Sequence, residues 1–212
     1  MHKRALVVVA ISAVLMGNQA WAVEKGNLIV RMGVGYVNPD DSSSDFSGAP
    51  GVGASVGSDT SLTINATYML TDNIGLDVLG ALPFEHDLSA TGALSGDVGS
   101  VKQLPPTIGL QYQFMPKNNI RPYVGVGVNY THFWDEDLNS TGKAVLGSLD
   151  LDDSWGLAGQ VGVDIDINKD WFVNADLRYI DINTEGKTDN VGKIDVDIDP
   201  WVFIIGIGTT FF

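Results

Sequence analysis

Apolar and polar residues alternate with a period of two in eight segments of this chain. Such alternation is typical of β-strands that have one apolar face. About 9–11 residues are enough for a strand that crosses a bilayer obliquely, and every segment reaches that length. The pattern therefore predicts an all-β protein whose strands are long enough to span a membrane. The segments are residues 27–37, 60–70, 74–84, 104–114, 121–134, 154–167, 171–181 and 198–212.

The connections between these segments differ in length in a regular way. Bacterial outer-membrane barrels combine long extracellular loops with short periplasmic turns, and an even number of strands can close so that every backbone group is paired. We therefore predict an eight-stranded antiparallel transmembrane β-barrel with four long extracellular loops and three short periplasmic turns. The short connections are residues 71–73, 115–120 and 168–170, and the long ones are 38–59, 85–103, 135–153 and 182–197.

The composition of the two strand faces indicates which one points outward. In the segment 121–134, Val124, Val126 and Val128 share one face, and Gly125 lies on the other. A soluble sandwich would bury the apolar face, whereas a membrane barrel exposes it to lipid. Periodicity alone fits both folds, but long acidic loops and aromatic residues at the strand ends favour the membrane barrel. We expect two aromatic girdles, Phe84, Trp134, Trp155 and Trp201 at the loop end and Tyr112, Phe114 and Trp171 at the turn end.

The first residues have the pattern of a secretory signal peptide. A basic start is followed by an apolar run from Ala5 to Met16 and by Ala20-Trp21-Ala22, a small-x-small cleavage pattern. We expect residues 1–22 to be cleaved and residues 23–212 to form the barrel.

Charge and cysteine content exclude several functions. The chain has 12 basic and 26 acidic residues, which argues against nucleic acid as a partner. It has no cysteine, so disulfides and thiolate metal sites are excluded, and we predict no cofactor. Acidic clusters such as Asp135-Glu136-Asp137 match no EF-hand spacing. We interpret them as solvated loop residues and predict no metal site, with weak cation bridging to lipopolysaccharide phosphates as the alternative.

Three prolines lie near the outer ends of the third and fourth predicted strands. They are Pro83, Pro105 and Pro106, and none of them can donate to a strand ladder. Because the two strands are neighbours, the missing donors fall in one seam. We interpret the three prolines as a lateral opening in the barrel wall; the alternative is that they only end the two strands at the loop.

Strand direction also predicts what fills the barrel, whose interior is only wide enough for side chains when eight strands close it. Polar and charged residues that face the lumen fall in the periplasmic half, where we expect them to form a plug. Apolar residues that face the lumen fall in the outer half. The predicted plug is Arg31, Asp77, Gln111, Asp164, Asp176 and Arg178, and the predicted apolar lumen residues are Leu79, Phe133 and Ile180.

His86 is the one candidate for catalysis. It lies between Glu85 and Asp87 and close to Ser89, which together are the residue types of a hydrolase. Nucleophilic catalysis needs a base oriented against a hydroxyl, and adjacency in a loop does not supply that. We therefore expect these polar residues to be solvated, assign no catalytic residue and predict that the protein is not an enzyme.

Several ordered motifs resemble the OmpW family of small outer-membrane barrels, and its OprG branch in particular. The resemblance covers nearly the whole mature chain. The motifs are N-P-D-D-S-S-S-D (38–45), T-D-N-I-G (71–75), L-P-P-T (104–107), R-P-Y-V-G-V-G-V-N-Y-T (121–131), D-S-W-G-L-A-G-Q-V-G-V-D (153–164) and D-P-W-V-F (199–203).

The resemblance implies a location in the bacterial outer membrane and passive uptake of small hydrophobic molecules through a barrel with a lateral opening. The expected partners are outer-membrane lipid, lipopolysaccharide and small hydrophobic solutes. One branch of the family is linked to small amino acids, and some members are receptors for bacteriocins. A conduit for amino acids, and a structural or receptor barrel recognised by a bacteriocin or phage through its acidic loops, are therefore the alternative functions.

Overall fold

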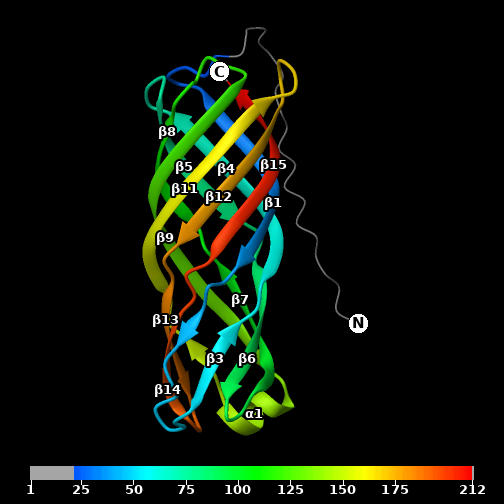
Figure 1. Cartoon of the computed structure of the whole chain (residues 1–212), viewed down its shortest axis with the longest axis vertical. Helices are drawn as coiled ribbons and strands as arrows, with labels where there is room; N and C mark the ends of the chain where they lie inside the picture. The colour runs from blue at the N-terminus through cyan, green and yellow to red at the C-terminus, as the bar shows by residue number, and fades with distance from the viewer. Residues whose placement is uncertain (1–21, 212) are drawn as a thin grey trace.

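Eight strands close into an antiparallel barrel in a computed structural model that describes residues 22–211 (Figure 1). The predicted signal peptide, apart from Ala22, and the C-terminal Phe212 lie outside the described residues. The pairing of β9 with β11 closes the barrel, so the predicted fold is confirmed. In chain order the barrel strands are β1 (Leu28–Asn38), β4 (Asp59–Met69), β5 (Ile74–Ala81), β8 (Thr107–Gln113), β9 (Ile120–Leu138), β11 (Ser154–Asp166), β12 (Phe172–Ile180) and β15 (Trp201–Phe211).

The predicted short turns join barrel strands at one end and are built from turn-forming side chains. Thr71 Oγ1 accepts a hydrogen bond from the Ile74 N–H at 2.9 Å. Asn168 Oδ1 accepts from the N–H groups of Asp170 and Trp171 at 2.9 and 3.0 Å. These bonds give the backbone a local partner where strand pairing stops.

The apolar strand faces point outward, as the composition predicted. Val126 is 73 % exposed and Ile205 is 74 % exposed, whereas Tyr123 on the opposite face is 1 % exposed. Apolar side chains on this outer surface have no protein to pack against, which is the arrangement expected where lipid covers the wall. Within residues 22–211, the structure contains no helix of the length and hydrophobicity needed to cross a membrane.

The four long connections are folded, and we call them together with the outer half of β9 the extracellular part. Two sheets form there, β3-β6-β7 continuing onto β9, and β10-β13-β14-β2. The sequence predicted loops without strands in this region. The elements are β2 (Ser42–Ser43), β3 (Val52–Val56), β6 (Phe84–Gly92), β7 (Gly96–Leu104), α1 (Ser140–Leu146), β10 (Asp150–Leu151), β13 (Asn183–Thr188) and β14 (Gly192–Asp197).

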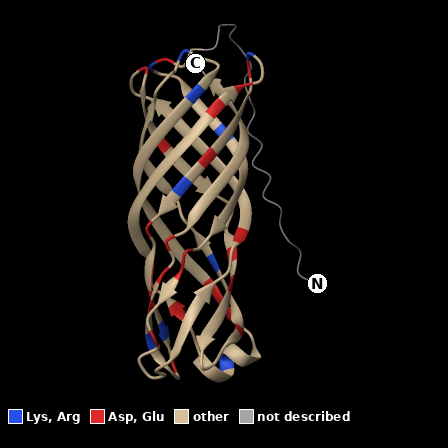
Figure 2. Cartoon of the chain, in the orientation of Figure 1, with Lys and Arg blue, Asp and Glu red and all other residues tan. Residues whose placement is uncertain are grey.

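Acidic residues are spread along the strands and loops of the extracellular part, with fewer Lys and Arg residues among them (Figure 2). Several pair with these cations, as Lys187 does with Asp152 and Lys193 with Glu185. Among the described residues, no group of three His, Asp or Glu side chains is placed to hold a metal ion.

Two apolar clusters lie inside the molecule. The larger one runs from the extracellular part into the outer half of the barrel and includes Phe84, Leu138 and Val202. The smaller one, which we call the turn-end cluster, consists of Val23, Ile29, Met69 and Phe172. A polar layer lies between them.

Candidate functional site

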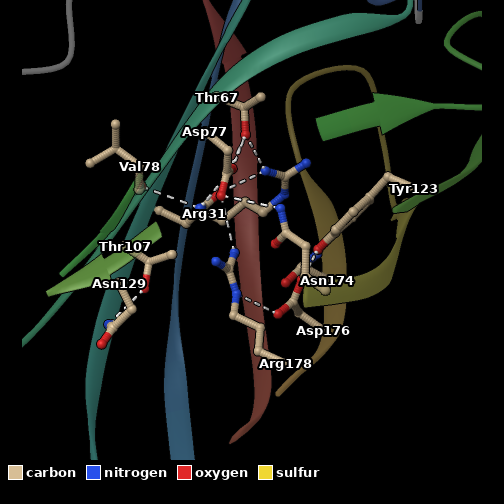
Figure 3. A network of polar contacts seen from close by, with 12 residues as sticks. Arg31, Thr67, Asp77, Val78, Thr107, Tyr123, Asn129, Asn174, Asp176 and Arg178 are labelled. Carbon is tan, nitrogen blue, oxygen red and sulfur yellow. Dashed lines mark hydrogen bonds and ion pairs between the residues drawn. The ribbon is translucent and has the colours of Figure 1, made fainter. Parts of the chain in front are cut away.

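The polar layer is built around Arg31 of β1 (Figure 3), which forms a buried ion pair with Asp164 of β11. The pair is bidentate, with Nε donating to Oδ1 at 2.9 Å and Nη2 donating to Oδ2 at 2.7 Å. Arg31 Nη1 also donates to Asn65 Oδ1 and to Thr67 Oγ1, at 2.7 and 2.8 Å. These bonds tie β1 to strands β4 and β11, which lie far apart in the sequence.

A second guanidinium, on Arg178 of β12, is held by two carboxylates. Its Nε donates to Asp176 at 2.8 Å, and its Nη2 donates to Asp77 at 3.3 Å. Asp77 also accepts from Thr67 Oγ1 at 2.7 Å and from Asn65 Nδ2 at 2.9 Å. Thr67 and Asn65 therefore join the two arginine sites into one network.

Tyr123 completes the connection across the barrel. Its hydroxyl donates to Asp176 at 2.7 Å and accepts from Asn174 Nδ2 at 2.9 Å. The Arg31 guanidinium lies 4.8 Å from the centre of the Tyr123 ring, a cation–π contact. A Cβ on Gly162 would lie 2.4 Å from this ring, so only glycine leaves it room.

Five of the six predicted plug residues belong to this network, and Gln111 does not. Gln111 is 1 % exposed and faces the lumen, but neither amide atom has a hydrogen-bond partner among the described residues. The alternation pattern did not identify Tyr123, Asn65 or Thr67 as parts of the network. Their alternation onto the lumen face was visible, but alternation does not say which polar side chains meet.

The turn end of the barrel is closed by the turn-end cluster and by the segment before β1. Val23 is 2 % exposed, and its N–H donates to the Pro116 carbonyl at 2.8 Å. Gly26 N–H donates to the Met69 carbonyl at 2.8 Å. An ion pair of 2.6 Å between Arg121 and Asp166 lies beside Phe172, which the Arg121 guanidinium contacts. A solute in the lumen would therefore meet a charged layer and then an apolar one.

An apolar cavity lies in the extracellular part, above the polar layer. The space open to the centres of water molecules is about 40 Å³, which is enough for a few waters. Of the three predicted apolar lumen residues, Phe133 lines this cavity, and Leu79 and Ile180 lie in the apolar cluster that continues below it. Ala54, Leu88, Val98, Leu146 and Ile194 are among its other lining residues.

His86 lies in β6 and borders this cavity, so our expectation of a solvated loop histidine was wrong. It is 1 % exposed, whereas Glu85 and Asp87 on the other face of the strand are exposed. Its Nδ1 lies 2.6 Å from the Gly57 carbonyl oxygen, and its Nε2 lies 2.8 Å from the Gln103 side-chain nitrogen. Both ring nitrogens are thus used in structural hydrogen bonds.

The three prolines lie between strands and not within them. Pro83 lies between β5 and β6, and Pro105 and Pro106 lie between β7 and β8. The predicted strand 104–114 therefore begins only at Thr107. The two adjacent prolines thus precede the strand and do not interrupt its ladder.

Strand pairing is interrupted between these prolines. The last pair of β5 with β8 is Leu79 opposite Thr107, and the first pair of β6 with β7 is Phe84 opposite Gln103. No ladder pair joins residues 80–83 to residues 104–106 in the described register. We call these two facing segments the proline seam.

Each side of the proline seam stays hydrogen-bonded to the barrel strand on the side away from the seam. On one side, Leu82 N–H donates to the Leu62 carbonyl of β4 at 2.8 Å. On the other side, the Pro106 carbonyl accepts from the Tyr130 N–H of β9 at 3.0 Å and from Asn129 Nδ2 at 3.2 Å. The interruption is therefore local, and the surrounding wall remains continuous.

A closed barrel with an apolar outer face and a lumen closed by charged and apolar layers defines a small outer-membrane β-barrel. The chain belongs to the OmpW family, whose model matches residues 24–211. It is 44 % identical over 218 residues to outer membrane protein W of Vibrio cholerae, covering 99 % of this chain and 100 % of that protein. The protein is accordingly assigned to the bacterial outer membrane.

The chain is also similar to two proteins of Pseudomonas aeruginosa. The crystal structure of OprG from Pseudomonas aeruginosa is similar with a TM-score of 0.86 and 43 % sequence identity, covering 91 % of this chain and 99 % of that one. A protein of Pseudomonas aeruginosa called dibenzothiophene metabolism operon protein PahQ is 29 % identical over 204 residues, covering 92 % of this chain and 93 % of that protein.

Proposed function

We propose that this protein is a passive channel for small hydrophobic molecules, which enter the apolar cavity from outside and leave sideways through the proline seam. The observation that carries the proposal is the interruption of strand pairing directly beside an apolar cavity. His86 and Gln103 line the cavity, and they lie three and two residues from Pro83 and Pro105. A solute in the cavity is therefore close to the hydrocarbon layer without having crossed the barrel.

The direct route to the periplasm is unfavourable for such a solute. Below the cavity it would have to separate Arg31 from Asp164 and Arg178 from Asp77, all of which are buried. Leaving a buried charge unpaired costs about 3–5 kcal/mol, which an apolar molecule cannot offset with hydrogen bonds. Lateral release avoids this layer.

Proline is suited to the edges of an opening in a membrane barrel. An unpaired backbone N–H in hydrocarbon costs several kcal/mol, and proline has no N–H to leave unpaired. Three prolines at the proline seam therefore lower the cost of interrupting the ladder. The carbonyl of Pro106 is in addition bonded to β9.

The nature of the solute is supported by one relative. The name of PahQ connects that protein with an operon for the metabolism of dibenzothiophene, an apolar aromatic molecule. Uptake of apolar compounds is consistent with the apolar lining of the cavity in this chain. We extend this class of solute to the present protein as part of the proposal.

A reversible cross-link across the proline seam tests the route. The chain has no cysteine, so Pro83→Cys with Leu104→Cys introduces one disulfide at the positions that would follow Phe84 and Gln103 in register. The uptake of labelled n-octane is measured in cells that produce equal amounts of folded protein. We expect the oxidised variant to lose uptake and the reduced variant to regain it.

A matched control places the cross-link within a paired region of the same hairpin. Glu85→Cys with Lys102→Cys joins two residues that already face each other in β6 and β7. This disulfide should leave uptake unchanged. If the seam cross-link also leaves uptake unchanged, lateral release is wrong; if wild type takes up no more octane than cells without the protein, the uptake function is wrong.

A further inference from the structure

The helix α1 covers the apolar cavity on the side that faces away from the barrel. It lies at the tip of the extracellular part, at the end of the molecule opposite the short turns (Figure 1). Leu146, the last residue of the helix, is 2 % exposed and lines the cavity, whereas Ser140, Thr141 and Lys143 are exposed. A solute that approaches the cavity from outside therefore meets this helix.

The cavity is too small in this arrangement for the proposed solutes. Its volume is about 40 Å³. A protein cavity that binds benzene measures roughly 150 Å³, which is several times larger. Because protein interiors are close-packed, the lining side chains cannot make that much room by compression. Entry of a solute such as octane therefore needs an element of the wall that moves outward.

The start of α1 is firmly attached to β7. Asn139, which precedes the helix, donates from Nδ2 to the Asp97 carbonyl and from its backbone N–H to the Val98 carbonyl, both at 3.0 Å. Its Oδ1 accepts from the Gly142 N–H at 2.9 Å and caps the helix. A Cβ on Gly142 would lie 2.1 Å from the Val98 carbonyl oxygen, so the two backbones pack directly against each other. This end of the helix is thus fixed to the sheet β3-β6-β7.

The other end of α1 rests on the turn between β13 and β14, residues 189–191. One hydrogen bond joins them in the described part of the chain, from the Asn190 N–H to the Leu146 carbonyl at 3.1 Å. Gly147 follows the helix with a φ of +79°, in the left-handed region that favours glycine. A Cβ on Gly147 would lie 3.0 Å from Asp189 Cβ and 3.2 Å from Asn190 Cγ, so glycine allows the close approach. This contact can open without breaking a strand ladder.

The two sheets of the extracellular part are joined more firmly between β2 and β3. Ser43 Oγ accepts from the Ala54 N–H at 2.9 Å, and Asp41 Oδ2 accepts from the Val56 N–H at 3.0 Å. The chain itself also connects these two strands through residues 44–51. The contact between α1 and the turn is therefore the side on which the extracellular part opens more easily.

We propose that α1 is a lid over the extracellular entrance of the apolar cavity, which closes on the turn between β13 and β14 and moves away from it to admit a solute. Leu146 leaves the cavity wall with the end of the helix, and the space that it vacates joins the cavity to the outside. This inference rests on the proposed uptake function and adds the entrance to it.

A thiol inside the cavity reports how often the lid opens. The chain has no cysteine, so Ala90→Cys places a single thiol at a position that is 5 % exposed and lines the cavity. Its rate of alkylation by N-ethylmaleimide is measured on the folded protein in lipid vesicles. Gly147→Gln in this background pushes against Asp189 and Asn190, and we expect alkylation to become about fivefold faster or more.

Gly51→Gln in the same background is the matched control. Gly51 lies in the extracellular part with a φ of +82°, but a Cβ there would meet nothing within 4 Å. The control therefore adds similar backbone strain without pushing on the lid, and the alkylation rate should stay unchanged. Equal alkylation rates in the Gly147 and Gly51 variants would overturn the inference.

A cross-link tests whether the lid has to open for uptake. Gly147→Cys with Asp189→Cys joins the end of α1 to the turn, at positions where the two Cβ atoms lie 3.0 Å apart before any adjustment. Disulfides have Cβ separations of about 3.5–4.5 Å, so a small shift accommodates the bond. We expect the oxidised variant to lose uptake of octane and the reduced form to regain it. Oxidation of the variant Glu85→Cys with Lys102→Cys, which links two strands of one sheet, should change nothing.

The outcomes separate the lid from the channel on which it rests. If octane uptake is the same in the oxidised and reduced forms of the Gly147 and Asp189 variant, the lid is wrong and the channel stands. If wild type takes up no more octane than cells without the protein, the channel is wrong. The alkylation rates then still decide whether α1 opens.

Discussion

Asp164 is the most completely buried carboxylate of the polar layer, with 0 % exposure, and it is held by Arg31 and Asn174. Asp164→Ala would leave the Arg31 guanidinium buried without its bidentate partner. We expect the free energy of unfolding to fall by about 3–5 kcal/mol. Urea unfolding of the protein in lipid vesicles, followed by tryptophan fluorescence, measures this change.

Replacing both residues of the ion pair distinguishes the loss of one partner from the loss of the whole pair. Arg31→Met with Asp164→Leu removes both charges, so it should cost less than Asp164→Ala alone. If the single variant unfolds within about 1 kcal/mol of wild type, the Arg31 side chain is not confined as described, and the polar layer is weaker than its geometry indicates.

His86 gives the extracellular part a dependence on pH. Its folded pKa is lowered chiefly by burial, whereas in the unfolded chain a histidine has a pKa of about 6.5. The unfolded state therefore binds the proton more readily. The neutral histidine makes its full contribution to the free energy of unfolding above about pH 6.5. This contribution is lost as the pH falls from there toward the folded pKa.

We therefore expect the urea concentration at the midpoint of unfolding to decrease when the pH is lowered from 7.5 to 5. The decrease should be smaller in His86→Gln. His132→Gln is the matched control, because the His132 side chain is 53 % exposed and pairs with an exposed Asp153. An equal fall in wild type and His86→Gln would assign the pH dependence to other groups.

At the level of single residues, alternation along the strands predicted which face each charged residue occupies. It predicted buried positions for Arg31, Asp77 and Arg178 inside the barrel, and these side chains are 2–4 % exposed. It did not predict which hydrogen-bond partners they have, or that Gln111 has none among the described residues. Partners depend on the stagger of neighbouring strands, which period-two alternation along one strand does not contain.

Among the elements, the barrel strands were predictable and the strands of the extracellular part were not. Barrel strands have an apolar lipid-facing side and lengths set by the bilayer, so their pattern is long and regular. β6 alternates as well, with Phe84, His86 and Leu88 buried, but it carries acidic residues on its other face. Solvated loops have the same composition. Whether β6 forms a strand therefore depends on how the segments around it fold.

Two strands, β11 and β15, begin at the extracellular rim in the same way. Asp153 accepts hydrogen bonds from Tyr130 and His132 just before Trp155, whose ring lies 4.8 Å from Tyr130. Asp199 accepts from the Tyr179 hydroxyl at 3.1 Å just before Trp201, whose ring lies 5.3 Å from Tyr179. Each motif joins a carboxylate, a tyrosine and a tryptophan on neighbouring strands. They fix the point at which the barrel wall passes into the extracellular part.

Removing one of these motifs should loosen the hairpin above it. Asp199 Oδ1 also accepts from the Ile182 N–H at 3.0 Å, so Asp199→Ala leaves this amide without its partner. We expect amide hydrogen exchange at Ile182 and the start of β13 to become at least tenfold faster, which corresponds to about 1.4 kcal/mol. Asp197→Ala, at an exposed position in β14, is the control; equal exchange in both variants would contradict the role of Asp199.

At the scale of the whole molecule, the lumen contains three successive layers. Apolar side chains fill the outer half, the polar network follows, and the turn-end cluster closes the other end. The first two layers were predicted from residue types along the strands. The third was missed because Val23 lies outside the strands, and its burial depends on the segment before β1 folding across the barrel end.

Closure of the barrel joins its first and last strands, with Leu28 opposite Phe211 and Asn38 opposite Trp201. A contact between residues so distant in the chain carries a loop-closure entropy of about 5 kcal/mol, so we expect closure to follow the pairing of strands that are neighbours in the sequence. Until β15 has been synthesised and paired, β1 presents an open edge with unpaired backbone groups, which is prone to aggregate. The edge of β1 therefore stays open until the last strand of the barrel pairs with it, and the eleven-residue β15 is the element that ends this exposure.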